Sequence, residues 1–385
     1  MSGSARLLRS INDAAVLRHL MERGPLTRVA IGELTGLAKP TTSQIVRRLA
    51  ADGLVRVTGH TSGRPGPNAE IYAVEPGAGF AAAVSVRAGA LVAAVCDLTG
   101  TVRGSAEVVG LGEPVGDVVE AVKAAARGGK VAVSKLGAVQ VAVPGAYDPA
   151  ADAVRLVDVP GWDRPGVAAA LGKRLRTAVA VDNDVNLAAV AERAARAEDS
   201  FALLWLGEDG LGLAVDLAGR LIRGARGGAG EIGYLPVSGD DDFHALVSGS
   251  AVRDLAARHG LVAESGTAAV ARAYAVQPDP NAPDHLGDPD ADPDEFEPFR
   301  RELALRIARG VAAVVAVVEP PVVVLAGEVG RAGGVRLCGH VQEALRDLSV
   351  LTADVSPSGV EGDAVLAGAV EAARSRLWTD LLDGR

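Results

Sequence analysis

The sequence predicts a mixed α/β protein with a small winged helix-turn-helix domain at its N-terminus. Residues 1–75 show three helical patterns and then two short strand patterns around a Gly- and Pro-rich turn, which is the order of a winged helix-turn-helix. Residues 76–385 pass twice through a β-meander followed by alternating helices and strands. The net charge also changes sign between these two parts. We therefore expect a nucleic-acid-binding head, residues 1–75, joined to a duplicated body of two lobes with a cleft between them.

The composition supports this division. The chain has 385 residues, of which 49% are hydrophobic, enough for several separate cores. Its net charge is −9, but the head holds ten basic and six acidic residues, which gives it +4 and leaves −13 for the body. A basic module on an acidic remainder is typical of a DNA-binding domain attached to an effector or oligomerisation domain.

Membrane insertion is not expected. The longest apolar run, 311–318, is far shorter than the ~20 residues that span a bilayer. Met1–Ser10 is polar and basic with no apolar run after it, so we expect no signal peptide. Cys96 and Cys338 are far apart in sequence and fit ordinary buried thiols. We expect a cytoplasmic, nucleoid-associated protein.

The first two helices of the head follow from apolar spacing and from capping residues. Apolar residues at helical spacing predict a helix over 13–23, which a Gly-Pro pair ends. Thr27 is expected to cap a second helix over 28–35, with Ile31 and Leu34 facing inward.

The third helix, from about Pro40 to Ala51, is the expected recognition helix, although no capping side chain precedes it. Strands over 54–57 and 70–74 form the wing, and Arg64 at its tip is placed to enter a minor groove. The outward residues are small polar and cationic types that reach base edges and phosphates. They are Lys39, Thr41, Thr42, Gln44, Arg47 and Arg48. The alternative interpretation is a three-helix bundle with a solvated basic face and an ordinary turn.

The body divides into a first lobe, 76–198, and a second lobe, 199–385, whose last helix is expected to pack back on the first lobe. In the first lobe an apolar strand, 178–181, runs into Asp182, Asn183 and Asp184, and an Ala-rich helix follows. Open α/β sheets bind their ligands at such carboxyl ends of strands.

The stretch 277–298 is rich in Pro and Asp. We expect it to be a disordered surface insertion, because the spacing and turn glycine of a calcium loop are missing.

Several motifs in this order resemble the ROK family (repressors, open reading frames and sugar kinases), in its transcription-regulator branch. They are GRPGPNAEIYAV at the end of the head, then VAVPGAYD, DVPGW, VDNDVNLAAVAE, GRLIRGARGGAGEIGYLPV and VVVLAGEVG. The resemblance covers nearly the whole chain. It implies an actin-like, duplicated body of the ribonuclease-H type, a homodimer or homotetramer, and control of carbohydrate-related genes.

The resemblance also implies roles for four residues. In members that phosphorylate sugars, Asp184 would match the general base and Asn183 a sugar contact. Glu231 matches the acidic sugar ligand of the family's GEIGH segment, where Tyr234 stands in place of the histidine. In a regulator these residues would bind a sugar or sugar-phosphate effector.

The departures from the family pattern argue against catalysis. Arg87 stands where the first phosphate loop carries a magnesium-ligating carboxylate. In the second phosphate loop, Glu208 and Asp209 would repel a triphosphate. The zinc site lacks its cysteine trio as well as its histidine, and His244 stands alone nearby. The prediction is therefore no cofactor, no metal and no enzymatic activity, with Asp184 a vestigial base.

The function predicted from the sequence is a DNA-binding transcription regulator, a repressor that binds an inverted-repeat operator as a dimer. Two alternatives remain open. One is an ATP-dependent sugar kinase with an accessory head. The other is a DNA-binding scaffold whose body responds to no ligand.

Overall fold

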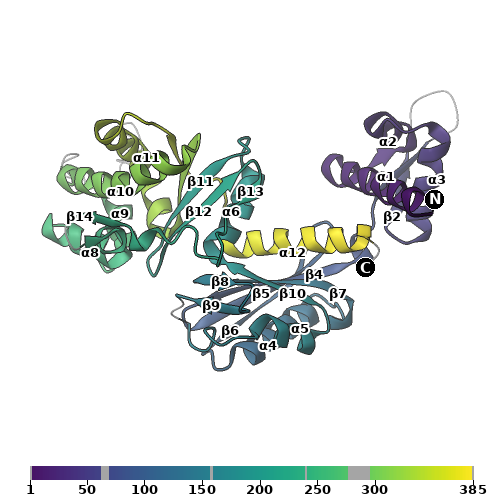
Figure 1. The fold of residues 1–385 in the computed structure, drawn as a ribbon, viewed down its shortest axis with the longest axis horizontal. Coiled ribbons are helices and arrows are strands. Elements are labelled where there is room, and N and C mark those ends of the chain that lie inside the picture. Colours follow the sequence, from purple (N-terminus) through teal and green to yellow (C-terminus); the bar gives the residue numbers. More distant parts are fainter. Residues whose placement is uncertain (1, 62–68, 157–158, 239–240, 276–294, 384–385) are drawn as a thin grey trace, which may run out of the picture. The chain divides into compact units, whose positions relative to one another are not determined.

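The structure is a computed structural model that describes residues 2–61, 69–156, 159–238, 241–275 and 295–383. The predicted wing tip with Arg64 lies outside these residues, as does the predicted insertion up to position 294. The chain forms two compact units (Figure 1). The first unit contains 1–143, 158–182 and 369–385, and the second contains 144–157 and 183–368. Among the described residues, no helix has both the length and the apolar character needed to cross a bilayer.

The head consists of three helices and a small sheet. Its helices are α1 (Ser2–Arg23), α2 (Arg28–Thr35) and α3 (Lys39–Ala51), and its strands are β1 (Leu26–Thr27), β2 (Val55–His60) and β3 (Glu70–Val74). The strand order is β1-β3-β2, so the two wing strands are antiparallel neighbours. Thr27 caps α2 as predicted, because its Oγ1 accepts from the Ala30 amide at 3.2 Å. The inward orientation predicted for Leu34 is wrong: it is 37% exposed, since the eight-residue α2 presents Ile31 to the core.

The rest of the first unit is a sheet with helices on both faces. The strands are β4 (Phe80–Arg87), β5 (Ala90–Asp97), β6 (Val102–Val109), β7 (Leu136–Val143) and β10 (Ala178–Asn183), in the order β10-β7-β4-β5-β6. The helices are η1 (Pro76–Ala78), α4 (Pro114–Gly128), η2 (Val133–Lys135), α5 (Val167–Leu175) and, from residue 369 on, the C-terminal α12 (Ala364–Asp383). Helices α4 and α5 cover one face and α12 lies on the other (Figure 1). Leu377 of α12 packs against Gly79 and Gly137, and the Trp378 indole donates to the Leu98 carbonyl at 3.0 Å.

The second unit contains the second sheet and a helical layer. The strands are β8 (Ala146–Asp148), β9 (Ala153–Arg155), β11 (Phe201–Leu206), β12 (Leu211–Leu217), β13 (Arg220–Leu221), β14 (Pro236–Ser238), β15 (Asp241–Asp242), β16 (Val322–Ala326) and β17 (Asp354–Pro357). The helices are α6 (Asp184–Ala195), η3 (Ile232–Tyr234), α7 (Phe243–Val247), α8 (Gly249–Arg258), α9 (Gly266–Ala273), α10 (Glu297–Val318) and α11 (Gly327–Leu348). Buried apolar side chains of α7 to α11 pack on β11 and β16 to form its core.

The two large sheets repeat one topology. In each, a three-stranded antiparallel meander begins with the strand that later gains a parallel neighbour, β4 with β7 and β11 with β16. The second sheet has the order β13-β12-β11-β16-β17, which repeats the order of the first. This confirms the predicted fold class, a winged helix-turn-helix head on a duplicated α/β body.

Candidate functional site

Helix α3 presents an exposed polar surface on the head. Lys39, Gln44 and Arg47 are exposed, and Thr41 is half-buried beside them. The Arg47 Nε donates to the Ser43 carbonyl at 3.3 Å, which directs the start of its side chain along the helix. These residue types can donate hydrogen bonds to base edges and phosphates.

Two residues predicted to face outward on α3 have other surroundings. Thr42 is 1% exposed, and its hydroxyl donates to the Ala38 carbonyl at 3.3 Å, so the prediction that it faces outward is wrong. It occupies the inner face of α3 with Ile45 and Val46. Arg48 is partly buried and forms an ion pair with Asp13 of α1. It therefore ties the recognition helix to the first helix.

A cluster that the sequence did not reveal holds α2 to the wing. Arg28 at the start of α2 pairs with Glu70 on β3, and the Tyr72 hydroxyl donates to the same carboxylate. The Arg28 guanidinium also lies 5.5 Å from the centre of the Tyr72 ring. Hydrogen bonding from Tyr72, together with Arg28, lowers the pKa of Glu70 despite some burial. The cluster fixes the orientation of the wing strands against the helices.

In the second unit the candidate ligand site begins at the first turn of α6. Asn183 is the N-cap of this helix, because its Oδ1 accepts from the Asn186 amide at 3.0 Å. Its Nδ2 donates to the Gly145 carbonyl at 3.1 Å, so both ends of the amide support the local fold. The Asp184 Oδ1 accepts from the Val185 amide at 2.8 Å.

Asp184 lies in an acidic and poorly solvated place. Burial raises its pKa to about 7, the amides of Val185 and Asp184 partly offset this, and the charges of Glu231 and Glu328 raise it further. Burial also raises the pKa of Glu231. Glu328 was missed from the sequence, although it follows strand β16 at the start of α11 just as Asp184 follows β10. The same pattern of a carboxylate after an apolar strand would have found it.

The glycine-rich loop before Glu231 is fastened by contacts that only glycine permits. Gly230 has φ +92°, and a Cβ there would lie 1.9 Å from the Leu213 carbonyl oxygen. The Leu213 amide donates to the Gly230 carbonyl at 3.0 Å, which places Glu231 next to β12. Tyr234, by contrast, is 64% exposed, and its backbone amide donates to the Glu231 carbonyl at 3.4 Å.

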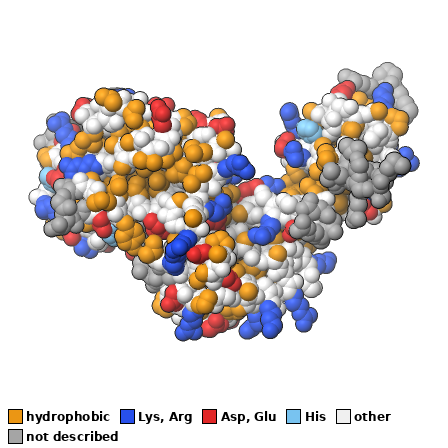
Figure 2. Space-filling view, in the orientation of Figure 1, with side chains coloured by type: hydrophobic (Ala, Val, Ile, Leu, Met, Phe, Trp, Pro, Cys, Tyr) orange, Lys and Arg blue, Asp and Glu red, His pale blue; other side chains and the backbone are white. Residues whose placement is uncertain are grey.

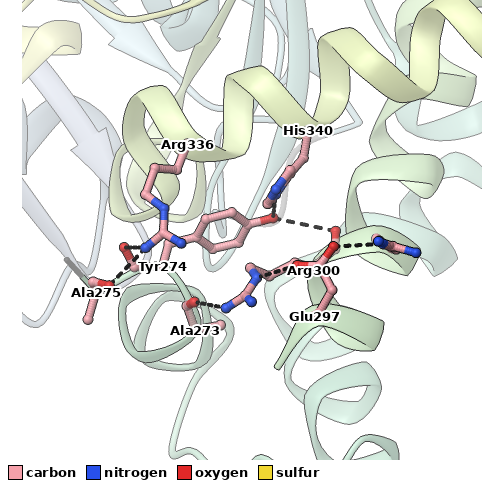
Figure 3. A network of polar contacts seen from close by, with 8 residues as sticks. Ala273, Tyr274, Ala275, Glu297, Arg300, Arg336 and His340 are labelled. Atoms are coloured by element: carbon pink, nitrogen blue, oxygen red, sulfur yellow. Dashed lines mark hydrogen bonds and ion pairs between the residues drawn. The ribbon is translucent and has the colours of Figure 1, made fainter. Parts of the chain in front are cut away.

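A second polar cluster lies on α9, α10 and α11 (Figure 3). Arg300 is 5% exposed and donates to the Glu297 carboxylate at 3.0 Å. The Tyr274 hydroxyl donates to the Arg300 carbonyl at 3.4 Å and lies 3.3 Å from the His340 Nδ1. Arg336 donates to the Tyr274 carbonyl at 3.3 Å. These bonds join the end of α9 to the start of α10 and to α11, which is a structural role.

The residues present do not fit the family's zinc or magnesium. Cys96 and Cys338 are buried, and burial raises their pKa values to about 11 and about 12, so both stay thiols. His244 is exposed, and across the described ranges no three His, Cys, Asp or Glu side chains gather as a metal site would need. Arg87 is the last residue of β4 and pairs with Ala90 across a two-residue turn. A magnesium ligand at this position would have to be an oxygen, which an arginine side chain does not supply.

The fold and these sites define a class of protein, a two-lobed α/β body with a winged helix-turn-helix head. Residues 83–376 match the ROK family and residues 9–64 match the MarR family. The chain belongs to the ROK family.

Known relatives are similar over part or all of the chain. NagC, a DNA-binding transcriptional dual regulator of Escherichia coli (strain K12), is 28% identical over 61% of this chain, and the match spans 59% of NagC. A ROK family transcriptional regulator that is a homolog of the E. coli MLC protein aligns over 98% of both chains with a TM-score of 0.76 and 18% identity. The ROK hexokinase of Thermus thermophilus aligns over 77% of this chain and 99% of its own, with a TM-score of 0.61 and 24% identity. At these identities the two structures share the fold with this chain, and no more follows from them.

Proposed function

We propose that this protein is a DNA-binding transcription regulator, a repressor of carbohydrate-related genes, and not an enzyme. The observation that carries the proposal is the winged helix-turn-helix head with Lys39, Gln44 and Arg47 exposed on α3. The names of relatives such as the regulator NagC support the same assignment.

DNA recognition is assigned to α3. Arg47 and Gln44 are one helical turn apart and have the donor geometry that pairs with guanine and adenine in the major groove. Lys39, with Thr41 beside it at the start of the helix, is assigned to phosphate contacts. A dimer would place two such helices in successive major grooves about 34 Å apart, which requires an inverted-repeat operator.

The body is proposed to bind a hydroxyl-rich effector, a sugar, at Asp184 and Glu231. Half-buried carboxylates accept hydrogen bonds from hydroxyl groups, and their desolvation is costly unless such partners bind. Asn183 fixes the start of α6 beside Asp184, and Tyr234 is assigned to the outer edge of the site.

Genome-wide mapping of bound DNA, followed by gel-shift measurements on the enriched sequence, tests the regulator assignment. We expect an inverted repeat that binds at least 10³-fold more tightly than unrelated DNA. Equal affinity for all DNA sequences would contradict it. The genes beside the sites would identify the pathway.

Thermal unfolding with a panel of neutral sugars and sugar phosphates tests the effector site. A true effector present at about 100 times its Kd adds about 2.7 kcal/mol of stability, and Asp184→Ala should abolish that shift. A coupled phosphorylation assay on the same sugars should show no turnover. Turnover that depends on Asp184 would instead establish a kinase.

A further inference from the structure

The loop between β11 and β12, Gly207–Gly210, places a carboxylate against the start of α9. The Glu208 Oε1 accepts from the Gly266 amide at 3.0 Å. Its Oε2 accepts from the Thr267 amide at 2.9 Å and from the Thr267 hydroxyl at 2.7 Å. Three donors thus meet one carboxylate at a helix N-terminus, where the helix dipole also favours an anion.

These contacts complete the first turn of α9. The Ala268 amide donates to the Ser265 Oγ at 3.0 Å, and the Ala269 amide donates to the Ser265 carbonyl at 3.0 Å. All four N–H groups from Gly266 to Ala269 therefore have acceptors within the chain, and none is left for a bound phosphate. Burial alone would raise the pKa of Glu208, but the hydrogen bonds from Thr267 and Gly266 more than offset it, so the pKa is lowered and the group is an anion at neutral pH.

Two glycines allow the close backbone contacts that surround the Glu208 side chain. A Cβ on Gly249 would lie 2.6 Å from the Glu208 carbonyl oxygen and 2.7 Å from its Oε1. A Cβ on Gly266 would lie 2.4 Å from the Gly249 carbonyl oxygen. The first turns of α8 and α9 and the loop are therefore in direct backbone contact, and this contact leaves no room for an inserted ligand group.

The same loop is connected to the candidate effector site. The Glu208 amide donates to the Glu328 Oε2 at 3.3 Å. Glu328 is one of the two carboxylates whose charge acts on Asp184. On the other side, Gly212 of β12 packs against Val185, the residue after Asp184.

We propose that Glu208 is a tethered anion that occupies the position a phosphoryl group would take at the start of α9. The second phosphate loop of the family is then closed by the chain's own carboxylate. No nucleotide is then needed to order this loop, and among the described residues the first-turn amides of α9 are not available to bind one. For the effector, this conclusion rests on the proposed function: the regulator would respond to a ligand at Asp184 without a nucleotide.

The test compares Glu208→Ala with Asp209→Ala, a matched change at the exposed neighbouring carboxylate. Thermal unfolding of the full chain is measured in chloride and in inorganic phosphate at equal ionic strength. Glu208→Ala should lower the Tm by several degrees in chloride, because it leaves three donors without their acceptor. Phosphate should recover part of that loss in Glu208→Ala and should leave the wild type and Asp209→Ala unchanged.

Glu208→Gln, which keeps the size of the side chain and one acceptor, serves if the alanine variant does not fold. An equal Tm for Glu208→Ala and Asp209→Ala would overturn the proposal, as would the same phosphate response in all proteins. Mg-ATP should also leave the Tm of the wild type unchanged, and a shift would contradict the assignment. None of these measurements uses DNA, so a failure here is distinct from a failure of the proposed regulator function.

Discussion

Two adjacent arginines on α3 have different surroundings, and the difference separates recognition from stability. Arg47 is exposed, whereas Arg48 is partly buried against Asp13. An exposed guanidinium is available to a guanine, while a paired one is already committed to the fold. Residue type alone gives both the same role, and their burial distinguishes them.

This contrast gives the first prediction. Arg47→Ala should weaken operator binding about tenfold or more and leave the Tm within about a degree, because a bidentate contact to guanine contributes about 1–3 kcal/mol. Arg48→Ala should lower the Tm, and the Asp13→Ala variant should lower it by a similar amount. Gel-shift titration and thermal unfolding of the three variants check this. An Arg48→Ala protein with normal stability and lost DNA binding would reverse the assignment.

The raised pKa of Asp184 gives a second prediction, on pH dependence. The folded chain holds the proton of Asp184 up to about pH 7, whereas an unfolded aspartate releases it near pH 4. The folded state therefore binds more protons over this range, and the Asp184 contribution lowers stability as pH rises from about 4 to about 7. Asp184→Asn removes this cost, so its Tm relative to the wild type should increase from pH 4.5 to pH 8. Asp209→Asn is the exposed control, and the same pH trend in that variant would contradict the assignment.

At the scale of elements, the sequence predicts the helices and strands whose ends are marked by local sequence signals. The predicted bounds of α2 and β3 are confirmed, because a capping residue or clear alternation marks their ends. Helix α11 is interrupted at Gly334, where φ is +51° and the backbone is not helical, so this glycine separates two helical segments, 327–333 and 335–348. Strand β17, Asp354–Pro357, was missed because its composition disfavours a strand and its parallel pairing with β16 supplies the structure.

The candidate site residues can be sorted in the same way, by whether a local sequence pattern marks them. Asp184 was singled out because a carboxylate directly after an apolar strand is a local pattern, and Glu231 because its segment resembles the family's GEIGH motif. The pairing of Arg48 with Asp13 and of Glu208 with Thr267 joins residues that are 35 and 59 positions apart. Such contacts depend on how helices pack, and no spacing along the chain indicates them.

The packing of α12 on α6 gives a third prediction. Gly368 lies in the part of α12 that belongs to the second unit, and a Cβ there would lie 1.7 Å from the Leu187 carbonyl oxygen of α6. Gly368→Ala should therefore destabilise the protein by about 1–3 kcal/mol, since the two helices must move apart. Gly339→Ala on α11 meets nothing within 4 Å and should instead gain up to about 1 kcal/mol of helix propensity. Urea unfolding compares the two, and an equal effect of both changes would show that α12 does not need this close contact.

At the scale of the whole molecule, the net charge has opposite signs in the DNA-binding head and in the rest of the chain. The head carries a net charge of +4, and the rest of the chain carries −13. Over the face of the second unit seen in Figure 2, basic and acidic side chains are interspersed. Attraction to DNA phosphates is therefore assigned to the head, and an acidic body reduces unspecific binding by the remainder of the chain.

The salt dependence of DNA binding can then be used to infer how many heads bind one operator. Each phosphate neutralised by a lysine contributes about 0.9 to the slope of log K against log salt concentration. Lys39→Ala should weaken binding to all DNA sequences alike and reduce the magnitude of this slope by about 0.9 per bound head, hence by about 1.8 for a dimer on an inverted repeat. Lys173→Ala, at an exposed position on α5, is the matched control and should leave the slope unchanged. A reduction of about 0.9 on the full operator would show that one head binds at a time, and no reduction would remove Lys39 from the interface.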